Sequence, residues 1–141
     1  MVPQIEFRYS NIYDERFKKH RKSKMASKRK FTEKTIKIYI KNLEKEWGKN
    51  GDKILLELEK LTRLRWHEQK IICYVVENTI PFSDPLTIPF YDKVDFAIDM
   101  LTHELIHQIY TQGNNLKKSE KAWNHLFKKY KKDTWNTVIH I

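Results

Sequence analysis

The chain has 141 residues, of which 40% are hydrophobic and 33% are charged. This length supports one domain with a single core, and this composition is typical of a folded soluble protein rather than a disordered one. The longest apolar run, Ile71 to Val76, is far too short to span a membrane. The N-terminus lacks an apolar signal segment and Cys73 is the single cysteine, so we expect a cytoplasmic protein without an internal disulfide.

The net charge of +10 is concentrated towards the two ends of the chain. Residues 8–30 contain ten Lys and Arg and two acidic residues, and residues 117–132 contain seven Lys and one acidic residue. Basic runs can attract nucleic acid or an anionic membrane surface, but like-charge blocks are more commonly solvated. We therefore do not favour a nucleic-acid partner. We expect a basic N-terminal extension (1–30), a central domain (31–132) and a C-terminal tail (133–141).

The first predicted elements are a short strand over residues 4–9 and a helical turn over residues 14–20. Thr32 can then cap a helix over residues 33–47. Its buried stripe consists of Ile36, Ile40, Leu43 and Trp47. These apolar residues recur at helical spacing, which is the pattern of a helix packed on a core.

The middle of the chain predicts a turn, a second helix and a strand. Asn50-Gly51 has the composition of a turn, and Asp52 can cap a helix that ends near Trp66. Residues 70–77 are apolar on both faces and rich in β-branched side chains, so they predict a buried strand with Cys73 as a core residue. Prolines at 81, 85 and 89 confine the next segment to a loop or an edge strand. We expect residues 86–90 to form an edge that can pair with a substrate peptide.

The most informative segment reads His-Glu-Leu-Ile-His over residues 103–107, an H-E-x-x-H motif. It lies in a helical pattern that Asp92 can cap and that Gly113 can end. The apolar stripe of this helix is Val94, Ile98, Leu101, Leu105 and Ile109. The motif is therefore expected in the middle of an amphipathic helix, beside a core-facing stripe.

The spacing of this motif suits a catalytic zinc site. Side chains four residues apart lie on the same helical face, so His103 and His107 can bind one Zn²⁺. Glu104 can then act as the general base towards metal-bound water. A catalytic zinc needs a third protein ligand. Glu120 is our favoured candidate, on a second helix that folds back antiparallel and turns Glu120 inward, and His125 is the rival.

The H-E-x-x-H helix followed closely by a glutamate helix resembles the gluzincin clan of metallopeptidases. The small size resembles the minigluzincins, small soluble relatives of the catalytic domains of membrane metallopeptidases. The resemblance covers about residues 70–131, and it implies that His103, His107 and Glu120 bind one Zn²⁺ per chain and that Glu104 is the base. The fold expected is α+β and mostly helical, with a zincin-like small sheet packed on the two motif helices. Larger gluzincins often carry Asp four residues after the ligand glutamate, where this chain has Asn124.

The alternative family is the SprT-like DNA-associated proteases, in which the same motif is followed by a third His and then an aromatic residue. Here the residue three before Trp123 is Glu120, which favours the gluzincin resemblance. A basic nucleic-acid-associated protease or binding module therefore remains the second hypothesis for this chain.

The predicted activity is hydrolysis of peptides or unfolded proteins, as an endopeptidase. A donor must stabilise the tetrahedral oxyanion, and the candidates are His125, Tyr91 and Tyr110. The C-terminal tail is apolar, and its His140 can cap the metal of the same molecule or of a second copy in a homodimer. Latency imposed by a C-terminal segment resembles the minigluzincins, whereas packing of the tail on the core is the alternative.

Overall fold

The computed structural model describes residues 1–20, 32–77 and 79–130. The elements in chain order are β1 (Gln4–Arg8), α1 (Asn11–His20), α2 (Glu33–Thr62), β2 (Lys70–Val76), β3 (Phe82–Ser83), β4 (Leu86–Pro89), α3 (Val94–Thr111) and α4 (Asn115–Tyr130). The fold of the described residues is α+β and mostly helical, as the sequence predicted. Within these ranges, no helix combines the length and apolarity that a membrane crossing requires.

Four strands form one mixed sheet in the order β1-β2-β4-β3. β1 and β4 both run parallel to β2, and β3 runs antiparallel to β4. The strands predicted near residues 4–9 and 70–77 are therefore confirmed, and β1 of the predicted extension belongs to the core sheet. Alternate side chains point to one face of each strand. The inward residues of β1 and β2 are Ile5, Phe7, Ile71, Cys73 and Val75, all buried.

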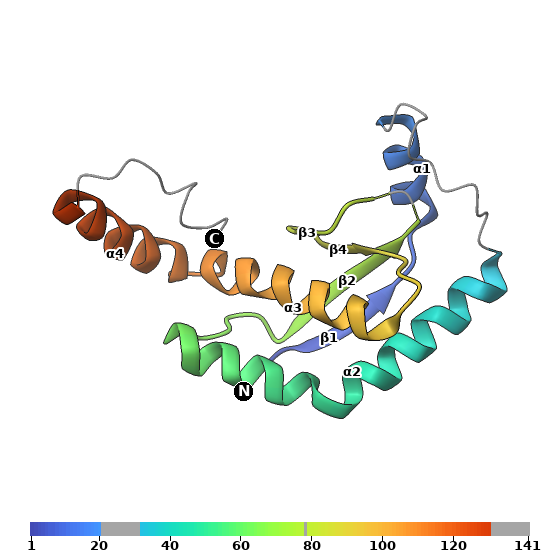
Figure 1. Ribbon diagram of the computed structural model, residues 1–141, viewed down its shortest axis with the longest axis horizontal. Coiled ribbons are helices and arrows are strands. Elements are labelled where there is room, and N and C mark those ends of the chain that lie inside the picture. The colour runs from blue at the N-terminus through green and yellow to red at the C-terminus, as the bar shows by residue number, and fades with distance from the viewer. Residues whose placement is uncertain (21–31, 78, 131–141) are drawn as a thin grey trace.

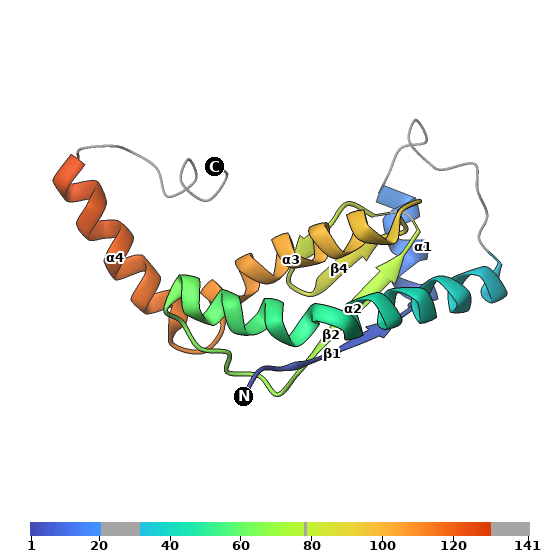
Figure 2. The same ribbon diagram turned by 60° about the horizontal axis from the view of Figure 1, so that its bottom comes forward.

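Helices α2 and α3 lie side by side on the inward face of the sheet, as both views show (Figures 1 and 2). α1 contacts β2 from the other face, where the rings of Tyr13 and Tyr74 meet edge to face with centroids 5.1 Å apart. The core residues with no exposed surface include Leu43 and Leu55 of α2 and Leu101, Leu105 and Ile109 of α3. Burying one such side chain stabilises the fold by about 1.5–3 kcal/mol, so α3 is held firmly where it carries the motif.

The two helices predicted around a turn at Asn50-Gly51 are one continuous helix, α2. The predicted start is confirmed, because the Thr35 N–H donates to the Thr32 hydroxyl at 3.2 Å. The predicted turn is wrong because Gly51 serves packing. A Cβ atom there would come within 2.5 Å of the Trp47 indole. Asp52 consequently lies inside the helix and caps nothing.

The edge strand predicted over residues 86–90 is also wrong, since β4 lies between β2 and β3. The two-residue strand β3 turns back at Asp84 and Pro85 and pairs Ser83 with Leu86 and Phe82 with Thr87. A strand this short has no alternating pattern that a sequence could reveal. The true edge beside α3 is therefore β3.

Candidate metal-binding site on α3

Helix α3 presents the motif from a well-anchored position. The apolar stripe predicted for it packs on the core, with Leu101, Leu105 and Ile109 fully buried. The predicted cap Asp92 is wrong, because the N-cap is Lys93, which makes no side-chain cap bond. Asp95 in the first turn instead complements the positive end of the helix dipole. The helix ends at Thr111, and Gly113 follows with a φ of +51°, the left-handed conformation that favours glycine after a helix.

The two motif histidines converge. The Nε2 atoms of His103 and His107 are 3.2 Å apart, and their ring centroids are 4.9 Å apart at an interplanar angle of 71°. Two nitrogens bound to a tetrahedral Zn²⁺ at ~2.05 Å are about 3.3 Å from each other. Without a metal, the same separation suits one imidazole-to-imidazole hydrogen bond. The pair therefore fits two positions of a zinc site, with no rearrangement of the helix.

Glu104 points into a much less polar environment than the histidines beside it. The residue as a whole is only 6% exposed, and no hydrogen bond to its carboxyl group is found among the described residues. Burial raises the pKa of this carboxyl, and the nearby His103 partly opposes the rise. A carboxyl group whose pKa is raised by partial burial is typical of functional sites.

Tyr91 lies close enough to Glu104 to respond to its charge. Burial, followed by the charges of Tyr39 and Glu104, raises the pKa of the Tyr91 phenol to about 12. The residue is held by its backbone N–H, which donates to the Tyr39 hydroxyl at 3.1 Å, and by an edge-to-face contact with Phe96. At neutral pH the phenol keeps its proton and remains a donor. Tyr110, by comparison, is half-buried against the core.

The two candidates for the third ligand lie elsewhere in this structure. α4 leads away from the sheet and does not fold back along α3 (Figures 1 and 2). The inward orientation predicted for Glu120 is therefore wrong, because α4 has little core to face, and Glu120 and His125 are both exposed. They share a groove of about 450 Å³ on α4. In the part of the chain that the structure describes, no three His, Cys, Asp or Glu side chains gather as metal ligands, and His140 lies outside that part.

The direction of α4 is set by Asn115, its first residue, which is fully buried. The Asn115 amide donates to the carbonyl oxygens of Arg65 and Ile109 at 2.7 and 2.8 Å. Its Oδ1 lies 3.2 Å from the Nε2 of His67. These bonds tie the start of α4 to the end of α3 and to the loop before β2. Because the contacts with Arg65 and His67 join residues about 50 positions apart, local sequence could not reveal them.

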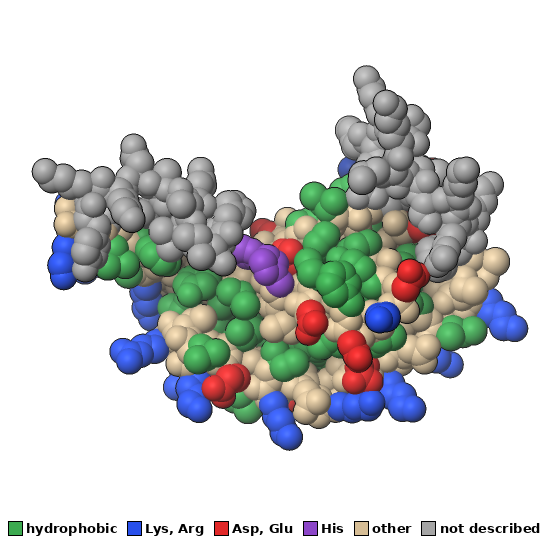
Figure 3. All heavy atoms as spheres, in the orientation of Figure 1, with side chains coloured by type: hydrophobic (Ala, Val, Ile, Leu, Met, Phe, Trp, Pro, Cys, Tyr) green, Lys and Arg blue, Asp and Glu red, His purple; other side chains and the backbone are tan. Residues whose placement is uncertain are grey.

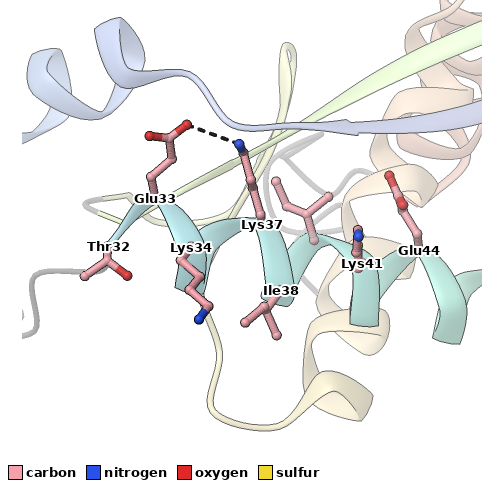
Figure 4. A pocket seen from close by; sticks show the side chains of 8 residues that line it. Thr32, Glu33, Lys34, Lys37, Ile38, Lys41 and Glu44 are labelled. Atoms are coloured by element: carbon pink, nitrogen blue, oxygen red, sulfur yellow. Dashed lines mark ion pairs between the residues drawn. The ribbon is translucent and has the colours of Figure 1, made fainter.

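The motif lies on the surface and not inside the grooves found along the helices. Figure 3 shows histidine side chains exposed near the middle of one face, over α3, beside a patch of hydrophobic side chains. A groove of about 850 Å³ lies instead along the first turns of α2, where Lys37 pairs with Glu33 at 3.3 Å (Figure 4). The residues that line this groove include none of the motif, so it does not enter the chemistry of the site.

Gln108 is a residue of this site that sequence reasoning missed. It is buried, and its side-chain nitrogen donates to the Ser83 carbonyl oxygen of β3 at 2.9 Å. The available signal was the spacing, because Gln108 and Gln112 follow Glu104 at intervals of four residues and so extend one polar row along α3.

Comparison of the chain with protein-family models, curated proteins and solved structures finds no match.

Proposed function

We propose that the chain is a zinc-dependent peptidase that hydrolyses peptides or unfolded proteins. The observation that carries the proposal is the 3.2 Å separation of the His103 and His107 Nε2 atoms directly beside the buried Glu104. A zinc ion held there would polarise a scissile carbonyl and lower the pKa of a bound water. Two imidazoles that can bind the metal and an adjacent carboxylate of raised pKa are the groups that zinc-dependent hydrolysis uses.

In this proposal each side chain has one task. Glu104 accepts a proton from water and delivers it to the leaving amine, and its raised pKa brings it nearer to the working pH of a general base. Tyr91, protonated at neutral pH, is the donor best placed to stabilise negative charge near Glu104. The third metal ligand is assigned to α4, with Glu120 favoured over His125.

Zinc content and proteolysis test the proposal together. The wild type should bind one Zn²⁺ per chain and cleave denatured casein, and a chelator should stop the cleavage. Glu104→Gln should keep zinc and lose activity by about 10²–10⁴-fold, whereas His103→Ala should lose both. Glu44→Gln, at an exposed position on α2, is the matched control and should change neither. Turnover by Glu104→Gln would refute the assignment of the base, and full zinc content in His103→Ala would refute the metal site.

The basic surface of α4 supports nucleic-acid binding as a second candidate function. Lys117, Lys121 and Lys128 line the same groove as His125 and Glu120. Lysine contacts to phosphates give affinity that falls steeply with salt. Binding of a DNA or RNA duplex that persists after chelation and weakens with salt would favour this function, and a Lys121→Glu variant should then bind more weakly.

A further inference from the structure

One polar row runs along the inward side of α3 and joins the motif to the edge strand. Glu104, Gln108 and Gln112 succeed one another at one-turn intervals, and all three are buried. Gln112 accepts the backbone N–H of His67 at 3.1 Å and lies 3.5 Å from the side-chain oxygen of Gln108. Gln108 in turn donates to Ser83 of β3. The base, the edge strand and the loop before β2 are therefore linked through consecutive turns of one helix.

The Gln108 bond holds a strand that has few other means of support. β3 has two residues and pairs only with Leu86 and Thr87. Such a short pairing is weak alone. From the opposite side, Phe82 contacts the ring of Phe17 with centroids 5.5 Å apart. The hydrogen bond from Gln108 to the Ser83 backbone therefore ties the edge strand to the helix that carries Glu104.

We propose that Gln108 is a positioning residue, which fixes β3 beside the His103–Glu104–His107 turn and so sets the position of an extended peptide against Glu104. This inference rests on the proposed function. Among the described residues, β3 is the outermost strand on the side of the sheet that contacts α3, and an extended peptide could add to such an edge by main-chain pairing. Because the peptide would pair with the edge of the sheet that Gln108 holds, loosening β3 should weaken peptide binding.

Peptide binding without turnover tests the inference separately from catalysis. In a Glu104→Gln background, the affinity for fluorescein-labelled denatured casein is measured by fluorescence anisotropy. Gln108→Met, which keeps the length of the side chain but cannot donate, should raise Kd about three- to tenfold, the factor expected for the loss of one hydrogen bond. Gln108→Glu, which cannot donate once ionised, should raise it at least as much.

Gln112→Met is the matched control, because it removes a buried glutamine from the same row without touching β3. It should change Kd less than twofold. With Glu104 restored, Gln108→Met should raise KM by the same factor as Kd, lower kcat less than twofold and leave zinc content at the wild-type value.

Two outcomes overturn the inference: no detectable peptide binding by Glu104→Gln, or equal weakening by the Gln108 and Gln112 variants. Peptide binding that depends on Gln108, in a protein that cleaves nothing with zinc present, would sustain the inference while removing the proposed activity. Failure of the proposed function is therefore distinguishable from failure of the inference.

Discussion

Replacing Glu104 by glutamine should stabilise the metal-free protein at pH 7 while removing the proposed general base. Glu104 as a whole residue is 6% exposed, and no hydrogen bond to its carboxyl group is found among the described residues. A buried polar group left unsatisfied costs about 1–3 kcal/mol, and a charged one costs more. The amide is still buried but carries no charge, so we expect a gain of about 1 kcal/mol in the free energy of unfolding. For a chain of this size, that gain raises Tm by roughly 4 °C.

The stabilisation should depend on pH, with a sign that the structure fixes. Because burial raises the pKa of Glu104 above its unfolded value, the native carboxyl keeps its proton to a higher pH than the unfolded one. The penalty for its charge is complete above the native pKa and disappears as pH falls towards the unfolded value. The advantage of the glutamine variant at pH 7 should therefore be lost near pH 4.

Thermal melts followed by circular dichroism, with a chelator present, measure both effects. Glu44→Gln, on the exposed face of α2, should shift Tm by less than about 1 °C at either pH because a solvated charge carries little penalty. A Tm for Glu104→Gln at or below that of the wild type at pH 7 would refute the reasoning. A gain of equal size at pH 4 would also refute it, since the charge of Glu104 would then not be its cause.

Three further predictions concern α2, the start of α4 and the metal. Gly51→Ala should destabilise the fold by about 1–3 kcal/mol, because its Cβ meets an indole ring, whereas Gly48→Ala, with nothing within 4 Å, should stabilise it by up to about 1 kcal/mol in urea unfolding. Asn115→Ala should cost about 2–3 kcal/mol because it removes the two hydrogen bonds that the Asn115 amide donates, whereas the exposed Asn114→Ala should cost close to nothing. Equal costs would contradict the role given to the Asn115 hydrogen bonds. Zinc at a hundred times its Kd should stabilise the wild type by about 2.7 kcal/mol in thermal melts and leave His103→Ala unchanged.

The sequence predicted those elements whose pattern is long and periodic. The stripe of α3, the buried strand β2 and the Thr32 cap of α2 all follow from side-chain periodicity or from a single capping residue. Whether Gly51 ends a helix could not be judged in this way. In the sequence, a glycine that makes room for an indole ring cannot be distinguished from a glycine that forms a turn. Local pattern therefore identifies the elements better than it identifies their ends.

In the candidate site, too, the features that depend on local spacing were predictable and those that depend on tertiary packing were not. The convergence of His103 and His107 follows from i, i+4 geometry within one helix, and the structure shows it. The burial of Glu104 and the Gln108 bond to β3 depend on how α3 meets the sheet, which spacing does not encode. The position of Glu120 depends on the angle between two helices, and that angle is set by contacts of Asn115 with residues remote in sequence.

Whether α4 can supply the proposed third ligand therefore depends on the conformation of the turn between α3 and α4. Glu120 or His125 can approach the histidine pair only if α4 rotates and Asn115 gives up its bonds, at a cost of about 1 kcal/mol for each hydrogen bond. Binding of Zn²⁺ to a full ligand set contributes about 10 kcal/mol or more, which exceeds that cost. If α4 supplies the ligand, zinc binding must break the hydrogen bonds of Asn115. The Asn115→Ala variant should then bind zinc more tightly than the wild type. Unchanged zinc affinity in that variant would show that the ligand comes from another part of the chain.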